Sequence, residues 1–252
     1  MTGLQKPASL MMVTYNRLDL TKKTLDSIFK NTDYPYELII IDNNSVDNTK
    51  KEIYRICADE TVVNNKYLKS TKFIFNDKNL GIAHGRNQGL AASSGDWLVT
   101  IDNDVLLPEG WLSECIGILD SNPDYGMIGV NMEGVKYPLV SNNCKEWECK
   151  VNGYLGTTCV VFSRNLHSAI GYFNMDYKLF GQEDVDFGIR ASVLGLKAGY
   201  IKEHGMHLLG EGEDGKYKEF KAESYKNNLS KFDANCMAYL SGKKSLYINF
   251  KP

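Results

Sequence analysis

Short apolar runs alternate with helix-patterned segments along the N-terminal half of the chain. Four of the runs have the length and composition of buried strands, and a polar loop follows each of them. This alternation predicts βαβ units, and therefore an α/β fold with a mainly parallel sheet flanked by helices. Because parallel strands end at one edge of a sheet, the loops are expected to line that edge. The predicted strands are SLMMVTY (9–15), ELIII (37–41), TKFIF (71–75) and DWLVTI (96–101).

The segments between these strands carry helical periodicity. In the first of them Leu18, Leu25, Ile28 and Phe29 fall on one face, and Asn16 is predicted to cap the helix. The turn at 33–35 is expected to end it. Further helices are predicted at 49–59, 84–94 and 107–120.

The pattern is less regular in the second half. Residues 131–150 are rich in Asn, Glu, Lys and Tyr, which is typical of a variable surface excursion. The segment 153–164 then predicts a buried strand. An acidic loop enters a helix in GQEDVDFGIRASVLGL, whose Val185, Ile189 and Val193 are expected to face the core.

The chain is expected to form one large domain at 1–209 with a C-terminal tail or flap at 210–252. Its 252 residues are enough for one α/β domain or two small ones, and the first is favoured. The tail mixes charged with aromatic residues. It is interpreted as an acceptor-site flap, an oligomer contact or a mobile arm, so a homo-oligomer remains an open expectation.

Charge and hydropathy narrow the classes of partner. Lys and Arg number 29 against 31 for Asp and Glu, and a net charge of −2 gives no bulk attraction to nucleic acid. The first residues lack the pattern of a signal peptide, and no apolar run approaches the roughly 18 residues of a membrane span. The expectation is a cytoplasmic protein without a transmembrane span, with peripheral membrane association left open.

The six cysteines are scattered, and several lie in apolar segments, which favours reduced thiols. A zinc site from Cys144, Cys149, Cys159 and His167 is conceivable, but these spacings match no common zinc module.

The segment TIDNDVLL (100–107) holds the most informative chemistry. It delivers two carboxylates, Asp102 and Asp104, from the end of a predicted buried strand, where open α/β sheets bind ligands. Such a pair can hold a divalent cation. An Asp-Asn-Asp run is also ordinary turn chemistry, so the segment alone leaves both interpretations open.

Three further segments accompany it in a fixed order: VTYNRLDLTKKTLDSI, IIIDNNSVDNT and, after a longer motif that contains Asp102, LFGQEDVDFGIRA. Together they resemble the inverting glycosyltransferases of family 2, which have the GT-A fold. The resemblance covers about residues 8–209. It implies a Rossmann-like nucleotide-binding half at about 8–107 and an acceptor half at about 108–209, with C-terminal acceptor-side elements.

The resemblance implies roles for residues near the nucleotide. Thr14 and Asn16 lie in a loop that wraps the nucleotide in the family, although both can also cap a helix. Asp42 ends the second strand, and the matching family position contacts the nucleoside; an Asx turn is the alternative. Arg86 is expected to contact the diphosphate or the base of the nucleotide; the alternative is a salt bridge on an exposed helix face. Asp102 would contact the ribose, or the metal through water.

Metal and catalytic roles follow in the same way. The resemblance implies that Asp104 binds Mg²⁺ or Mn²⁺ and that His207 is a further ligand, for which His204 competes. It makes Asp184 the general base, with Glu183 as the fallback. Acids at a helix start also gain from the helix dipole. Asp186 and Arg190 are expected to be structural partners one helical turn apart.

The expected function is therefore metal-dependent, inverting sugar transfer from a nucleoside-diphosphate donor to an acceptor hydroxyl, as in polysaccharide biosynthesis. A UDP-sugar is the default donor, with dTDP-rhamnose or a GDP-sugar as alternatives. The acceptor is a glycan, a lipid-linked intermediate or a protein. Aromatic residues that could stack on a sugar, or simply pack in the core, are Trp147, Tyr154, Tyr172 and Phe173.

Other classes remain as alternatives. A haloacid-dehalogenase-like phosphatase would use Asp102 as a nucleophile, but its motif normally follows the first strand of the domain. A sugar-1-phosphate nucleotidyltransferase would need a Gly-rich basic loop, which MMVTYNR lacks. A non-catalytic nucleotide-sugar-binding homologue is the third alternative.

Overall fold

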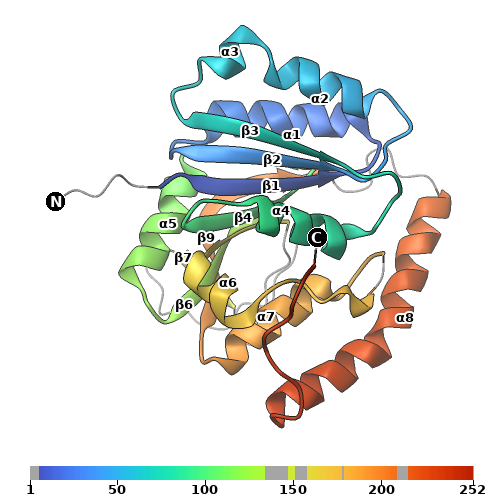
Figure 1. Ribbon diagram of the computed structural model, residues 1–252. Coiled ribbons are helices and arrows are strands. Elements are labelled where there is room, and N and C mark those ends of the chain that lie inside the picture. The colour runs from blue at the N-terminus through green and yellow to red at the C-terminus, as the bar shows by residue number, and fades with distance from the viewer. Residues whose placement is uncertain (1–5, 134–146, 151–157, 178, 209–214, 252) are drawn as a thin grey trace.

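A computed structural model describes residues 6–133, 147–150, 158–177, 179–208 and 215–251 (Figure 1). In the N-terminal half, strands and helices alternate and the strands run parallel in the order β3-β2-β1-β4, which confirms the predicted α/β pattern. The elements are β1 (Ala8–Thr14), α1 (Leu18–Asn31), β2 (Tyr36–Asp42), α2 (Thr49–Cys57), α3 (Glu60–Val63), β3 (Leu68–Phe75), α4 (Ile82–Ala92) and β4 (Trp97–Asp102).

The second half extends the same sheet with mixed pairing. β8 and β6 continue from β4 in antiparallel fashion, β9 runs parallel to β6, and β5 and β7 pair antiparallel with β9. The parallel character is thus confined to the first four strands and the β6–β9 pair. The elements are β5 (Val105–Leu106), α5 (Trp111–Ser121), β6 (Tyr125–Glu133), β7 (Trp147–Lys150), β8 (Cys159–Ser163), α6 (Arg164–Ile170), the 3₁₀ helix η1 (Met175–Tyr177), α7 (Glu183–Val193), β9 (Lys197–His207) and α8 (Gly215–Leu240).

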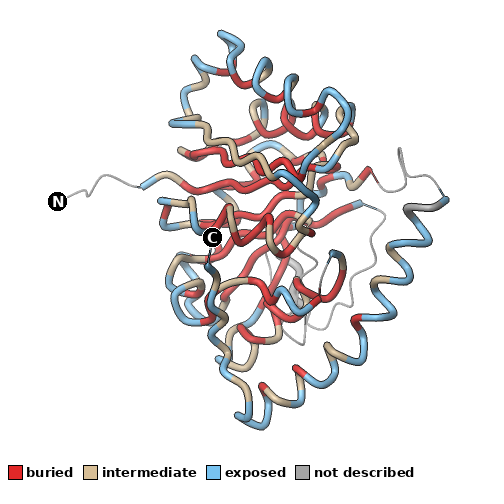
Figure 2. Tube along the Cα trace, turned by 45° about the vertical axis from the view of Figure 1, so that its right-hand side comes forward, coloured by how far each residue is buried: buried red, intermediate tan, exposed pale blue. Residues whose placement is uncertain are grey.

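Two hydrophobic layers cover the two faces of the sheet. β1 is buried along its whole length, and its side chains alternate between the layers. Leu10 and Met12 pack with apolar side chains of α1, α2 and α5, whereas Met11 and Val13 pack with those of α4, α6 and α7. Figure 2 shows the strands as a buried band between largely exposed outer helix surfaces. This arrangement fixes the strand ends as the natural site for ligands.

The predicted cap of the first helix is wrong. Arg17, in the left-handed region at φ 61°, precedes α1, and it makes no side-chain capping bond. Asn16 instead accepts a hydrogen bond from the backbone N–H of Val46 at 2.8 Å, and its own N–H donates to Ser45. Its side chain therefore ties the loop after β1 to the loop after β2, because a long-range partner competes with the local one.

The predicted core face of α7 is also wrong. Val185, Ile189 and Val193 are only half-buried, while Phe187 packs in the core. The buried face includes the Asp186–Arg190 pair, which the sequence did predict as structural partners; their side-chain atoms lie 2.7 Å apart. A buried ion pair occupies the face that an apolar stripe would otherwise take.

Residues 131–150 were expected to form a surface excursion. Only their ends are described: β6 runs to Glu133 with all but its terminal positions buried, and β7 pairs with β9. Residues 134–146 lie outside the described residues, as do Cys144 and Tyr154, and nothing is described of the Trp147 and Cys149 side chains. Of the remaining aromatic candidates, Phe173 stacks on Phe187 in the core.

The cysteines whose side chains the structure describes are all free, and three of them are buried: Cys57, Cys115 and Cys159. This agrees with the reduced-thiol interpretation for that part of the chain. Within the same part, no helix is long and apolar enough to cross a bilayer.

Of the predicted tail, residues 215–251 are described. α8 packs against α7 and η1, and the segment after it returns across the molecule, where Ile248 pairs with Gly171 (Figure 1). Asp186 forms the centre of this contact: it accepts hydrogen bonds from Tyr177 at 2.7 Å and from Tyr239 of α8 at 3.1 Å. The tail is thus integrated with α7 through a buried polar network.

Candidate functional site

A cavity of about 350 Å³ lies at the carboxyl ends of β1 and β4. Its remaining walls are the start of α4, the loop and first turn of α7, the end of β9 and the first turns of α8. This is the edge that the strand pattern predicted for ligand binding. Most of the predicted site residues line it, and they come from several different elements.

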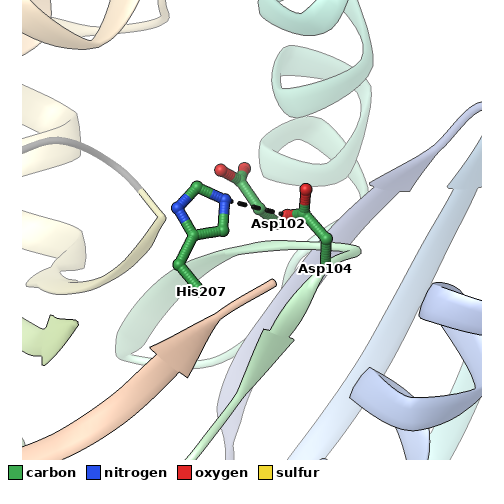
Figure 3. A group of neighbouring side chains, drawn as sticks. All are labelled: Asp102, Asp104 and His207. Atoms are coloured by element: carbon green, nitrogen blue, oxygen red, sulfur yellow. Dashed lines mark ion pairs between the residues drawn. The ribbon is translucent and has the colours of Figure 1, made fainter. Parts of the chain in front are cut away.

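Asp102, Asp104 and His207 converge on one side of the cavity (Figure 3). One ligand-type atom from each lies within 4.8 Å of the others. The antiparallel pairing of β5 with β9 sets Val105 opposite His207, which brings the imidazole Nε2 to 3.2 Å from a carboxylate oxygen of Asp104. His204 instead bonds to Asn131, so the geometry places His207 and not His204 beside the aspartates.

The donor set of this cluster suits a divalent cation. Two carboxylates and an imidazole are ligands that Mn²⁺ accepts, and the carboxylates also suit Mg²⁺. Burial raises the pKa of Asp102 to about 6, although the neighbouring Arg86 opposes the shift. Burial on its own would also raise the pKa of Asp104, but hydrogen bonding to His207 and the charge of Arg17 lower it. Two carboxylates held this close gain from any added positive charge.

His207 and Arg17 supply that charge in this structure. Arg17 donates to Asp104 at 3.0 Å. Burial by itself lowers the pKa of His207, yet its hydrogen bond to Asp104 raises the pKa above its ordinary value. The two aspartates therefore lie where a positive charge stabilises them, which fits the predicted metal ion.

Arg86 connects this cluster to the start of α7. Its guanidinium donates to Glu183 and to Asp102, both at 2.9 Å. The side chains of Arg86 and Glu183 are each only 6% exposed, whereas that of Asp102 is 28% exposed. The salt-bridge alternative for Arg86 is the one that the structure shows, but the bridge is buried in the cavity wall and not on an exposed helix face.

The start of α7 presents two acids to the cavity. Glu183 is held by Arg86, and burial followed by the charge of Asp184 raises the pKa of Glu183 to about 7. Asp184 is half-buried and lines the cavity beside it. Of the two predicted base candidates, Asp184 is the one that is not committed to the buried Arg86 bridge.

Of the residues predicted to contact the nucleoside end of the donor, Thr14 lines the cavity, whereas Asn16 and Asp42 are not among its lining residues. The Thr14 hydroxyl lies 3.1 Å from that of Thr21. Asp42 accepts from the backbone and side chain of Ser45, which is the Asx-turn alternative. Among the described residues, the wall at this point contains Asn43 in place of Asp42 or Asn16.

Sequence reasoning missed several wall residues. Arg17 follows the first strand directly in TYNR, so a cation next to the strand end was the available signal. Helix α8 also lines the cavity, through Phe220, Lys221 and Tyr225. The positive charge of Lys221 acts to lower the pKa of His207. No pattern in the mixed tail pointed to them, because α8 reaches the site only through tertiary packing.

Comparison with known protein families finds a match that spans more than half of the chain. The model of the family described as "Glycosyl transferase family 2" matches residues 9–190. An uncharacterized glycosyltransferase of Bacillus subtilis, YwdF, is 27% identical over 196 residues, covering 73% of this chain and 67% of the relative. The glucosyl-dolichyl phosphate glucuronosyltransferase of Haloferax volcanii is 28% identical over 123 residues, covering 48% of this chain but only 36% of that protein.

Solved structures share the fold. The mannosyltransferase PcManGT of Pyrobaculum calidifontis, in complex with GDP-Man and Mn²⁺, superposes with a TM-score of 0.67 at 20% identity, covering 95% of this chain and 75% of the other. S. aureus TarS 1–349 in complex with UDP gives a TM-score of 0.61 at 20% identity, covering 78% and 58%. At these identities the likeness establishes the GT-A-type architecture alone.

Proposed function

Since the chain belongs to glycosyl transferase family 2, we propose that it is a metal-dependent, inverting glycosyltransferase that uses a nucleoside-diphosphate sugar. One observation carries the proposal: the Asp102–Asp104–His207 cluster and Asp184 line the same cavity. A site for the departing diphosphate and a base for the acceptor are thus available to a single bound donor. The family match favours this function over a phosphatase that would use Asp102 as its nucleophile.

Asp104 and His207 would hold the metal, with Asp102 beside it or on the ribose. A bound Mn²⁺ or Mg²⁺ supplies positive charge that neutralises the diphosphate as it departs. Arg17 already neutralises Asp104 from the cavity wall, and Thr14 and Asn43 offer polar groups near the nucleoside end. We propose a UDP-sugar as the donor; the structural neighbours named above were solved with GDP-Man and with UDP.

Asp184 would accept the proton of the acceptor hydroxyl as that oxygen attacks the anomeric carbon. Proton transfer concerted with attack needs no unusual pKa, so an ordinary carboxylate suffices. Attack from the face opposite the diphosphate inverts the configuration at that carbon. Glu183 is the weaker candidate because Arg86 already binds one of its oxygens. The acceptor would be a glycan, a lipid-linked intermediate or a protein.

The test is a thermal-shift panel of UDP, GDP and dTDP, each with and without Mn²⁺, because a ligand that binds the folded state raises its stability. We expect a metal-dependent shift with one nucleotide in the parent protein, and its loss in Asp104→Asn. Asp120→Asn, an exposed carboxylate of α5, is the matched control and should behave like the parent. No shift with any nucleotide in folded protein would refute the proposal.

Turnover separates catalysis from binding. Release of nucleoside diphosphate from the selected donor, with added acceptor sugars, is expected for the parent protein. Tight donor binding with no release under any condition would instead favour the non-catalytic homologue.

A further inference from the structure

Two buried polar atoms at the start of α7 have no hydrogen-bond partner among the residues that the structure describes. They are Gln182 Nε2 and Glu183 Oε2. Gln182 is 3% exposed and Glu183 is 4% exposed, and both line the cavity. Buried donors and acceptors are nearly always satisfied in folded proteins, so two such atoms on the cavity wall mark a place where a ligand can bind.

Helix capping does not account for the Gln182 side chain. Gln182 precedes α7, but its side-chain carboxamide makes no capping bond. Its backbone carbonyl accepts the hydrogen bond from the backbone N–H of Asp186 at 2.9 Å. Its backbone lies in the left-handed region at φ 77°, directly after Gly181 at φ 92°. A non-glycine residue in this region is uncommon and persists where the surroundings impose it.

The contact that holds this backbone conformation comes from α8. The Asn228 side-chain amide donates to the carbonyls of Tyr177, Phe180 and Gly181 at 2.6, 2.9 and 3.2 Å. A Cβ added to Gly181 would lie 3.4 Å from the Tyr225 ring, in ordinary contact, so it is the positive φ that favours glycine there. The loop before α7 is therefore held in the one conformation that carries the Gln182 amide into the cavity wall.

We propose that Gln182 Nε2 and Glu183 Oε2 bind the transferred sugar and select a neutral sugar, a hexose or N-acetylhexosamine, over a hexuronic acid. The inference rests on the proposed function. Arg86 occupies Oε1 of Glu183, which leaves Oε2 as an acceptor on the cavity wall that also holds the donating amide of Gln182.

The chemistry of the pair carries the selectivity. One donor and one acceptor on the same cavity wall can match two hydroxyls of a sugar, or the C=O and N–H of an acetamido group. A hexuronic acid offers the same ring hydroxyls, so the discrimination would come from its C6 carboxylate. That carboxylate offers no proton to Oε2 and would bring a further negative charge to the wall formed by Glu183 and Asp184, where burial strengthens repulsion.

The test compares Gln182→Met, which keeps the side-chain length but removes the donor, and Gln182→Gly, which suits the positive φ. Calorimetric titration with Mn²⁺ would measure binding of UDP, UDP-glucose, UDP-N-acetylglucosamine and UDP-glucuronic acid, or the same series on the nucleoside that the stability panel selects. We expect about 10-fold weaker binding of the neutral UDP-sugars in both variants and unchanged binding of UDP. Asp120→Asn, the exposed carboxylate of α5 used above as a control, should match the parent protein.

Several outcomes would overturn the inference. They are an equal loss for UDP and its sugars, no loss for any ligand, or a parent protein that binds UDP-glucuronic acid as well as the neutral sugars. If the parent protein binds donor and transfers sugar while both Gln182 variants bind normally, this inference alone is refuted. If the parent protein binds no nucleotide at all, the proposed function fails, and the inference fails with it.

Discussion

Removing the guanidinium of Arg86 is expected to destabilise the protein through the carboxylates that it leaves behind. Arg86→Met keeps most of the side-chain stem, but deletes the donors to Glu183 and Asp102 and the guanidinium contact over the Phe173 ring. The two broken contacts are unequal. Glu183 is almost wholly buried, whereas the Asp102 side chain is 28% exposed and partly reaches solvent.

The magnitude follows from this inequality. Breaking a buried ion pair by deleting one partner typically costs about 3–5 kcal/mol, and a partly exposed pair contributes about 1 kcal/mol or less. Protonation of Glu183 limits the loss, because its pKa of about 7 already lies close to neutral pH, so the lower end of the first range applies. We therefore expect Arg86→Met to lower the free energy of unfolding by about 3 kcal/mol, which corresponds to about 6–12 °C in melting temperature for a chain of this size.

A double-mutant cycle isolates the buried pair. Urea unfolding of the parent protein, Arg86→Met, Glu183→Gln and the double variant gives four free energies. In the Glu183→Gln background no buried charge is left behind, so the additional loss from Arg86→Met should fall to about 1 kcal/mol. If Arg86→Met costs the same in both backgrounds, the bridge is not what Arg86 contributes and the reasoning is wrong.

Three further predictions concern other parts of the molecule. Asp184→Asn should lower the transfer rate by about 100-fold or more while nucleotide affinity stays unchanged, as measured by product release and calorimetry; normal turnover would remove Asp184 from the mechanism. Asn228→Ala should cost about 2 kcal/mol and speed hydrogen exchange in the loop before α7, because one buried amide satisfies three carbonyls there; unchanged exchange would contradict the clamp. Burial by itself raises the pKa of Glu37, but hydrogen bonds from Lys72 and two serines lower it to about 2. A lowered folded-state pKa means that Glu37 stabilises the protein fully above about pH 5 and loses this effect as the pH falls toward 2. The stability gap between the parent protein and Glu37→Gln should therefore shrink from pH 6 to pH 3, and a constant gap would refute the assignment.

The parallel half of the sheet follows from the sequence because burial on both faces leaves a continuous apolar signature. β1 and β2 are buried at every position, and their runs of Met, Val and Ile predict this burial directly. α7 shows the opposite case. Its buried face contains Asp186 and Arg190, whose charges cancel in a contact that hydrophobic periodicity does not detect. Periodicity therefore predicts a core face at Val185, Ile189 and Val193, which are only half-buried.

The site shows the same division. Asp102 and Asp104 follow a recognisable strand, and their position needs no tertiary information. The choice of His207 over His204 depends on the register of β9 against β5, which pairs residues far apart in the chain. Gln182 carried no signal, because its conformation is imposed by α8 through Asn228 and is not encoded in its own neighbourhood.

The integration of α8 has a consequence for the order in which the protein assembles during synthesis. β1 to β4 leave the ribosome before α8 does, and chains fold from the N-terminal side while they emerge at about 5–20 residues per second. Until α8 has been made, Asp186 cannot accept the hydrogen bond from the Tyr239 hydroxyl, and the Asn228 side chain cannot donate to the carbonyls of the loop before α7. A nascent chain can therefore pair its parallel strands and present its aspartate pair before it has the α8 side of the cavity, so the cavity is complete only once α8 has been made.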